Sequence, residues 1–210
     1  MFKDQELDFG VLGQEDGTLI MYDAQTSSQW SQLFGEAVKG EMKGERLVQI
    51  PSMLTTWEKW KVLHPETTVY IKRSIPYHRL SDFSKETIAK HATKADGPVE
   101  NIDLVVGVEG HVEAKAYLFR YLAKKRVLND DLENHPIVVF LSEDLATARI
   151  FDRSLDGWLW DKTLTFRGTE GDRLQDQETN SLWDPMSGEA ISGPLKGKQL
   201  KLYVSTTSLW

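Results

Sequence analysis

Two glutamates stand at the same place in two similar stretches of the chain, and they are the residues best suited to acid–base chemistry. They are Glu36 and Glu189, and each follows a shared aspartate, Asp23 or Asp176. Two carboxylates about 5 to 10 Å apart form the catalytic pair of many glycosidases, because one protonates the leaving group while the other attacks or activates water. Glu36 and Glu189 are therefore the candidate catalytic pair of a carboxylate-dependent hydrolase, acting on an extracellular polymer at the interface of the two stretches.

A structural role explains the same carboxylates more simply, and we favour it. An aspartate followed by Thr three residues on and Ser five residues on is typical of an Asx turn, in which the carboxylate accepts backbone N–H groups. The glutamates have Lys43 and Lys196 nearby in sequence as ion-pair partners. Under this interpretation the chain has no catalytic residue.

Other catalytic and metal-binding motifs are missing from the sequence. Cysteine is absent, which excludes disulfides, iron–sulfur clusters and cysteine nucleophiles. The histidines, at positions 64, 78, 91, 111 and 135, include no His-Glu-x-x-His pair, and the chain has no Gly-x-Ser-x-Gly turn and no phosphate-binding glycine loop. We therefore expect no metal site and no cofactor.

One segment carries the candidate binding residues. Trp158 and Trp160 are two residues apart, so in a strand they would share one face and form an aromatic platform for a sugar or a protein. Asp152 and Arg153, just before them, complete the candidate binding set. The structural alternatives are a sheet face covered by the linker for the tryptophans, and an ion pair for Asp152 and Arg153.

The composition is that of an ordinary globular chain, and it narrows the partners. The 210 residues include 25 basic and 32 acidic side chains, a net charge of −7. Nucleic-acid binding needs clustered Lys and Arg, so we expect no nucleic-acid partner. No apolar run approaches the roughly 20 residues of a membrane span, and the opening MFKDQELDF does not have the pattern of a signal peptide.

An internal duplication supplies the elements that must position these residues. Residues 23–57 and 176–210 align without a gap at an offset of 153, with 13 identities in 35 positions, where about two are expected by chance. The shared positions include Trp30 and Trp183, and glycines that mark tight turns. Each copy therefore reads as a small β meander.

The fold class that follows is mainly β with a few short helices, in which duplicated β meanders form a sandwich or barrel-like sheet. The expected strands outside the meander cores are 103–109, 111–117, 137–141 and 147–152, with 47–50 and 200–204 closing the two copies. The expected helices are 118–127 and 58–63, the second ended by His64-Pro65.

The copies are unequal, which divides the chain into three segments. Residues 1–72 form an incomplete first copy with a tail helix, residues 73–100 an ordered linker, and residues 101–210 the second copy. Because the first copy lacks the strands that precede the second meander, its sheet would leave edges unpaired. Either residues 103–166 cover both meanders or another chain supplies the cover, which predicts a dimer or a larger assembly.

Several motifs occur in an order that resembles a known family. They are Gly-Val-Glu-x-x-x-x-Ala-Lys-Ala-Tyr, Asn129-Asp130, Thr147–Arg153, Met21-Tyr22-Asp23-x-x-Thr-x-Ser-x-Trp, Gly-Glu-Ala-x-x-Gly-x-x-Lys-Gly, Thr56-Trp57 and His64-Pro65. Together they resemble the bacterial domain of unknown function three-one-seven-nine over nearly the whole chain. The resemblance implies a mostly β module that often appears twice, commonly in exported proteins, and it implies no activity.

The chain departs from that family at the positions best suited to soft-metal or redox chemistry. Members often carry Cys-Pro-Leu-Cys before the Phe-Asp-Arg strand, where this chain has Ser142 and Leu145 at the cysteine positions. Members also often show Trp-His-Glu before Asn-Asp, where this chain reads Lys124-Lys125-Arg126. This chain therefore cannot carry out any family chemistry that uses those Cys and His residues.

We accordingly expect a non-catalytic binding or assembly module, one that could serve as a subunit of a larger exported complex. The expected partner is another protein or a second copy of the chain, with carbohydrate as a further ligand class. An extracytoplasmic location, periplasmic or secreted, is favoured by the resemblance alone.

Overall fold

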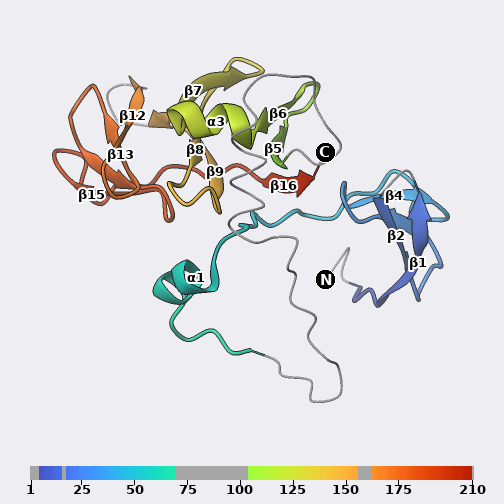
Figure 1. The fold of residues 1–210 in the computed structure, drawn as a ribbon. Helices are drawn as coiled ribbons and strands as arrows, with labels where there is room; N and C mark the ends of the chain where they lie inside the picture. The colour runs from blue at the N-terminus through green and yellow to red at the C-terminus, as the bar shows by residue number, and fades with distance from the viewer. Residues whose placement is uncertain (1–4, 16–17, 70–103, 156–161, 210) are drawn as a thin grey trace. The chain divides into compact units, whose positions relative to one another are not determined.

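The structure is a computed structural model, and it describes residues 5–15, 18–69, 104–155 and 162–209 (Figure 1). Contacts within the chain form two compact units, Met1–Ile50 and Pro51–Trp210. The predicted linker, residues 73–100, lies outside the described residues, so its order and the boundaries on either side of it stay predictions.

The N-terminal unit is a four-stranded antiparallel sheet in which each strand pairs with the next along the chain. Its strands are β1 (Phe9–Glu15), β2 (Thr18–Asp23), β3 (Gln29–Ser31) and β4 (Glu36–Lys39). This is the β meander that the first repeat predicts.

The C-terminal unit contains the other strands and both helices of the described chain. Its first strands are β5 (Leu104–Glu109), β6 (Ala114–Leu118), β7 (Val127–Leu132), β8 (His135–Leu141), β9 (Ala148–Asp152), β10 (Ser154–Leu155) and β11 (Lys162–Thr163). Its last strands are β12 (Phe166–Thr169), β13 (Arg173–Asp176), β14 (Leu182–Asp184), β15 (Glu189–Ser192) and β16 (Ser205–Leu209).

Strands β12 to β15 form a second meander that repeats the first, down to its register. Trp30 of β3 faces Ala37 of β4, and Trp183 of β14 faces Ala190 of β15. In each copy the register shifts at the residue just before the tryptophan. The two copies that the sequence alignment identifies therefore also share the same strand pairing. The prediction of a mainly β fold is confirmed.

The sheet β7-β8-β9 lies at the centre of the C-terminal unit and is buried on both faces. The β8 sequence runs Ile-Val-Val-Phe-Leu, and all five residues, 137–141, are buried. Because successive side chains of a strand point to opposite faces, such an unbroken apolar run indicates a strand covered on both sides. Two separate clusters of buried side chains provide that cover.

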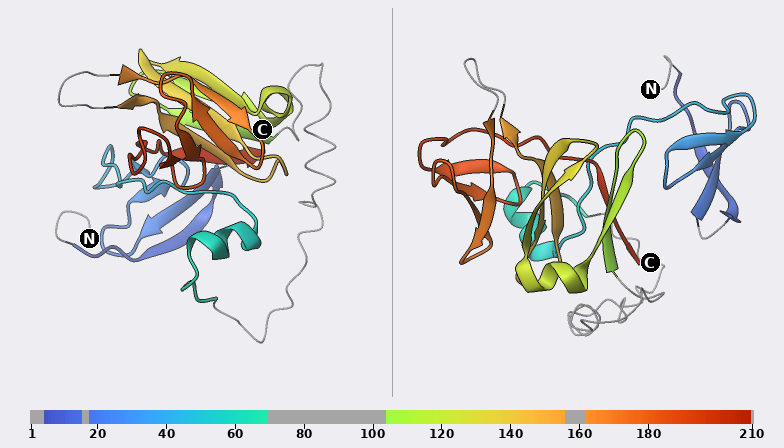
Figure 2. Two further views of the ribbon diagram at one scale, coloured as in Figure 1. Left: turned by 90° about the vertical axis from the view of Figure 1, so that its left-hand side faces the viewer. Right: turned by 90° about the horizontal axis from the view of Figure 1, so that it is seen from above.

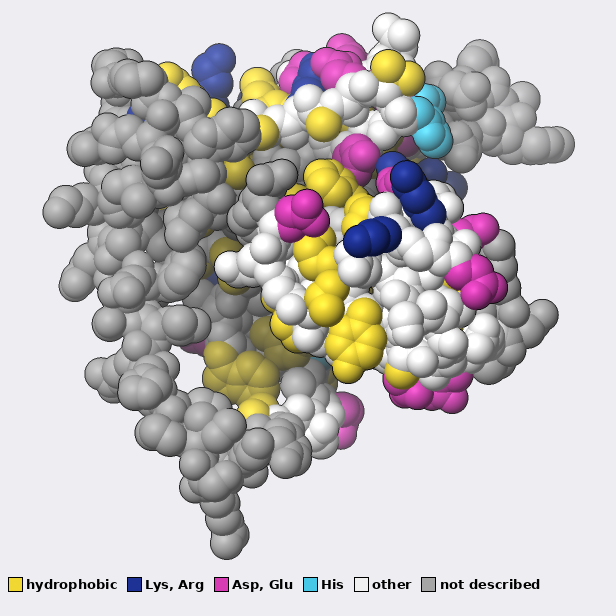
Figure 3. Space-filling model, turned by 90° about the vertical axis from the view of Figure 1, so that its right-hand side faces the viewer, with side chains coloured by type: hydrophobic (Ala, Val, Ile, Leu, Met, Phe, Trp, Pro, Cys, Tyr) yellow, Lys and Arg dark blue, Asp and Glu magenta, His cyan; other side chains and the backbone are white. Residues whose placement is uncertain are grey.

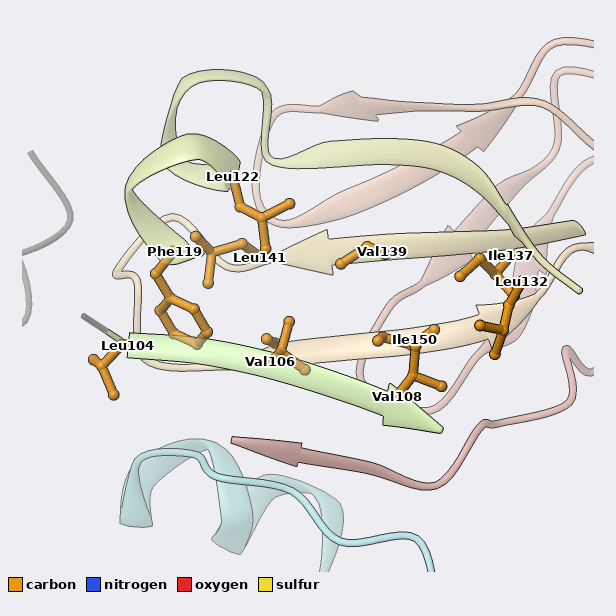
Figure 4. Packing of buried hydrophobic residues seen from close by; sticks show 11 residues of the cluster. Leu104, Val106, Val108, Phe119, Leu122, Leu132, Ile137, Val139, Leu141 and Ile150 are labelled. Carbon is orange, nitrogen blue, oxygen red and sulfur yellow. The ribbon is translucent and has the colours of Figure 1, made fainter. Parts of the chain in front are cut away.

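One face of the central sheet packs against β5 and the helix α3 (Phe119–Lys125). Ile137, Val139 and Leu141 of β8 contribute to this core, together with Phe119 and Leu122 of the helix. Figure 4 shows these side chains directed into the space between β5, α3 and the β8–β9 pair. Strand β5 also pairs with β6 and β16 in a three-stranded sheet.

The other face of the central sheet packs against the second meander. Val138, Phe140 and Phe151 project toward the β12–β15 sheet, where Phe166 and Trp183 are among the buried partners. The C-terminal unit is thus a layered stack of antiparallel sheets, visible from two sides in Figure 2, and no sheet of the described residues closes into a barrel.

The helix after the first repeat, α1 (Trp57–Leu63), forms where the sequence predicts it and ends at His64. The Thr56 hydroxyl accepts a 3.3 Å hydrogen bond from the Lys59 backbone N–H, which caps the first turn. Although α1 follows the first copy in sequence, it belongs to the compact unit Pro51–Trp210.

The structure differs from the expected strands at three places. The expected strands at 47–50 and 200–204 do not form; Leu202 makes only an isolated bridge to Phe151, and the last strand begins at Ser205, paired with β5. Strand β7 was not expected, because its Asn129-Asp130-Asp131 segment is polar. Pairing with β8 overrides that local preference.

Candidate functional site

The shared aspartates are structural, as the Asx-turn interpretation predicts. Oδ1 of Asp23 accepts the Thr26 backbone N–H at 2.5 Å, and Oδ2 accepts Nε1 of Trp30 at 2.9 Å. Oδ1 of Asp176 accepts the Thr179 backbone N–H at 2.6 Å in the second copy. Asp23 and Asp176 are fully buried, so neither is presented to a substrate.

The candidate catalytic glutamates occupy equivalent places in the two sheets but have different neighbours. Glu36 forms an ion pair with Arg46 at 2.7 Å, in place of the expected Lys43. Glu189 opens β15 and lies opposite Gln199, the residue equivalent to Arg46. The two glutamates belong to different units, so the hydrolase pair stays a prediction.

Of the candidate binding residues, Asp152 ends strand β9 and Arg153 follows it, and the two make separate contacts. Oδ1 of Asp152 accepts the Ser154 backbone N–H at 2.8 Å. The Arg153 guanidinium donates to the backbone oxygens of Ile137 and Leu164 at 3.2 and 3.1 Å, and it lies 3.4 Å from a carboxylate oxygen of Asp131. These contacts join β9 to its neighbours. Trp158 and Trp160 lie outside the described residues, so the binding set as a whole stays a prediction.

In the turn where family members often carry two cysteines, this chain uses the hydroxyl group of Ser142 as a hydrogen-bonding group. The buried Ser142 accepts the Thr147 backbone N–H at 3.0 Å and donates to Oδ1 of Asp144 at 2.6 Å. Leu145, at the second cysteine position, has φ of 56° and packs against the core of the β5 side. The turn is thus held by hydrogen bonds and apolar contact, with no thiolate ligand.

A cluster of charged side chains connects α1 to this turn through ion pairs. Nζ of Lys59 lies 2.9 Å from Oδ1 of Asp144 and 3.4 Å from Oδ2 of Asp172. Arg126 donates to the other oxygen of Asp172, which also accepts the Glu143 backbone N–H at 2.8 Å. Burial raises the pKa of Asp144, but hydrogen bonds from Ser142 and Lys59 outweigh it and hold that pKa below its usual value.

Beside this cluster α1 forms one wall of a cavity of about 670 Å³. The cavity lies within the C-terminal unit. Its lining residues are Pro51, Ser52, Met53, Trp60, Leu63, His64, Arg149, Met186 and Ser187. The wall is mostly apolar, and its polar side-chain groups are two hydroxyl groups, one imidazole, one guanidinium and the indole N–H of Trp60.

Arg149 is the charged residue of this cavity and is only 8% exposed. Its terminal nitrogens donate to the backbone oxygens of Ser52 and Met186 at 3.5 and 3.1 Å, and its guanidinium lies 5.8 Å from the Phe151 ring centroid. Its Nε has no hydrogen-bond partner, and no carboxylate of the described residues pairs with it. Burial lowers the pKa of this guanidinium.

Sequence reasoning did not select Arg149 as a site residue. Arg149 lies within Thr147–Arg153, one of the motifs shared with the family. The sequence feature that could have identified it is a charged residue between Ala148 and Ile150 in a buried strand. Within the described residues no group of three His, Asp or Glu side chains could hold a metal ion.

The N-terminal sheet has a second feature of interest, an uncovered apolar face. Phe9 and Phe166 occupy equivalent positions, since each is paired in register with the shared aspartate, and each meets its tryptophan edge-on at 5.7 Å. Phe166 is 2% exposed, whereas Phe9 is 40% exposed. Figure 3 shows hydrophobic side chains gathered on the surface over this sheet. Within the described part of the N-terminal unit, no second sheet covers the first meander as the central sheet covers the second.

The fold defines a mainly β protein with a duplicated meander, one copy of which packs on a central antiparallel sheet. The chain belongs to the family described as Protein of unknown function (DUF3179), whose profile matches residues 1–172 and again residues 87–210. This is the family that the sequence motifs resemble, and the two overlapping matches agree with the duplication. No curated protein and no solved structure matches the chain. In the described part of the chain, neither helix has the length and apolar character needed to cross a membrane.

Proposed function

We propose that the protein is a non-catalytic assembly module that binds a second copy of itself through the exposed face of its N-terminal sheet. The observation that carries the proposal is the difference between Phe9 and Phe166, which hold the same place in the repeat but differ in exposure, 40% against 2%. A sheet of four short strands with one apolar face gains stability by covering that face.

The internal repeat indicates what kind of surface the exposed face binds. In the C-terminal unit, the equivalent face packs on a sheet that presents Val138, Phe140 and Phe151. The N-terminal unit also exposes aromatic and aliphatic side chains, among them Phe9 of β1 and Leu33 in the turn between β3 and β4. Leu33 is equivalent to Met186, which packs against the core beside the second meander. Two copies related by a twofold axis would therefore offer each other an apolar sheet, in the manner of a β sandwich.

Sedimentation velocity of the full chain over a range of concentrations tests the proposal. We expect a monomer–dimer equilibrium that Leu33→Asp shifts toward the monomer, because Leu33 is 45% exposed and its replacement would bury a charge in the interface. Val112→Asp is the matched control, since Val112 is 96% exposed in the C-terminal unit. A wild-type chain that stays monomeric at every concentration, or a Leu33→Asp chain that dimerises like wild type, would overturn the proposal.

A further inference from the structure

The buried guanidinium of Arg149 is a charge without a counterion among the described residues. Lys59, Lys115, Arg126, Arg153 and Arg173 each have a carboxylate within 4 Å. Arg149 is more buried than these side chains and yet has two backbone oxygens as its hydrogen-bond partners. Removing a charge from water is costly unless an opposite charge replaces the lost solvation, so a buried cation of this kind favours an anion beside it.

The guanidinium retains donors for such an anion. Arginine has five N–H groups, and the bonds to Ser52 and Met186 use two of them, which leaves 5 − 2 = 3, of which one is on the buried Nε and two are on the terminal nitrogens. The planar arrangement of these groups matches the two oxygens of a carboxylate. Ser52, which also lines the cavity, adds a hydroxyl donor near the same wall.

The remaining wall indicates the body of the ligand. Trp60 lines the cavity, and its indole Nε1 donates to the Thr67 hydroxyl at 2.9 Å, which fixes the plane of the ring. The ring centroids of Trp60 and His64 are 4.2 Å apart, so the imidazole packs against the indole and helps to hold it in place. Pro51, Met53 and Met186 add apolar contact. A fixed aromatic ring and a cation in the same cavity suit a compact ring that bears an acidic group.

From this arrangement we propose that the cavity between α1, β9 and the β14–β15 turn binds a small organic carboxylate carried on a six-membered ring, with Arg149 holding the carboxylate and Trp60 contacting the ring. A cavity of about 670 Å³ accommodates one such molecule. The site lies wholly in the C-terminal unit, so it does not depend on the assembly proposal.

Isothermal titration of the full chain at low salt tests the site with charged and neutral probes of matched shape. The probes are D-glucuronate with D-glucose, and benzoate with benzyl alcohol, and inorganic phosphate is the competing anion. We expect binding of at least one carboxylate, weaker binding of its neutral match, and loss of affinity as salt is added. Whether glucuronate or benzoate binds more tightly distinguishes a sugar acid from an aromatic acid.

Two variants assign the binding to the cavity. Arg149→Met removes the charge while keeping an unbranched side chain, and we expect at least about a tenfold loss of carboxylate affinity, because hydrogen bonds to charged groups typically contribute a factor of ten or more. Ser187→Trp fills the rim and leaves Arg149 in place, so it should abolish binding even if Arg149→Met fails to fold. Ser154→Trp, a bulky change elsewhere in the same unit, is the control.

Three results would contradict the proposed site. Absence of binding by both carboxylates to the wild-type chain, unchanged affinity in a folded Ser187→Trp chain, or tighter binding of phosphate than of either carboxylate would overturn the assignment.

Discussion

The indole nitrogen of Trp183 donates a 2.9 Å hydrogen bond to Oδ2 of Asp176, and both side chains are fully buried. The equivalent bond from Trp30 to Asp23 has the same length. In each copy the aspartate also accepts backbone and hydroxyl groups of the turn that follows it, so a single carboxylate joins the turn to the tryptophan at the core of the sheet. This bond explains why the aspartate and the tryptophan recur together.

Replacing Asp176 should destabilise the C-terminal unit more than a typical surface change. We expect Asp176→Ala to lower the free energy of unfolding by about 3 kcal/mol, because it leaves the buried Trp183 N–H and the partly buried Thr179 N–H without an acceptor. Asp176→Asn should cost less, since the amide oxygen still accepts one of these bonds. Chemical denaturation measures both values, and a loss below about 0.5 kcal/mol for the alanine variant would contradict the structural role.

Two glycines of the second copy allow the cost of a left-handed backbone to be measured separately from the cost of steric overlap. Gly193 and Gly197 both have positive φ, 89° and 83°. A Cβ at Gly193 would lie 2.7 Å from Cα of Ser181, whereas one at Gly197 would meet nothing within 4 Å. We expect Gly197→Ala to cost about 1 kcal/mol through the left-handed backbone alone, and Gly193→Ala about 3 kcal/mol, because the backbone must also move. Equal losses in thermal or chemical unfolding would show that the close approach to Ser181 is unimportant.

The exposed carboxylate of Glu133 should make the β5–β6 hairpin sensitive to acid. Hydrogen bonds from the backbone N–H groups of Glu113, Val112 and His111 lower the pKa of Glu133 from 4.5 to about 2. Since the folded pKa is the lower one, the contribution of this contact to stability is present above pH 4.5 and is lost as the pH falls toward 2.

Amide hydrogen exchange of the β5–β6 turn, followed from pH 6 downward by NMR, measures this effect. After correction for the intrinsic pH dependence of exchange, protection of the Val112 and Glu113 amides should fall between pH 4.5 and about 2. Glu133→Gln should remove that step because it has no carboxylate to titrate. A step that persists in the variant would assign the transition to another group.

Lys59 should control the attachment of α1 to the rest of its unit. Its ammonium group lies 2.9 Å from Asp144 and 3.4 Å from Asp172, and all three side chains are partly buried. We expect Lys59→Met to cost about 1 kcal/mol and to increase proteolysis within α1, with the sheets left intact. Lys61→Met is the control on the same helix, since Lys61 is exposed and lies near the Trp57 ring. Equal protease sensitivity in the two variants would contradict this role of Lys59.

Local sequence was sufficient to predict the meanders and the end of α1. The shared Asp-x-x-Thr-x-Ser-x-Trp pattern predicts the turn that Asp23 forms with Thr26, because the carboxylate meets groups only a few residues away. His64-Pro65 ends the helix for an equally local reason, since proline disfavours a helical residue before it. Strand β7 was not predicted because its formation depends on a contact between residues far apart in the sequence. The Asn129 amide donates to and accepts from the Phe166 backbone, at 2.8 Å in each case, and so ties β7 to β12.

The sequence alone therefore determined the repeat, the mainly β class and the shared turns, all of which depend on residues close together in the chain. Only the tertiary structure decided that Phe9 is exposed while Phe166 is buried, because that difference arises from which sheet covers each one. The same holds for Arg149, whose place in a strand could be read from the sequence but whose lack of a carboxylate partner among the described residues could not. The partners of a buried charge come from distant segments, such as the backbone oxygens of Ser52 and Met186, and those neighbours exist only once the chain has folded.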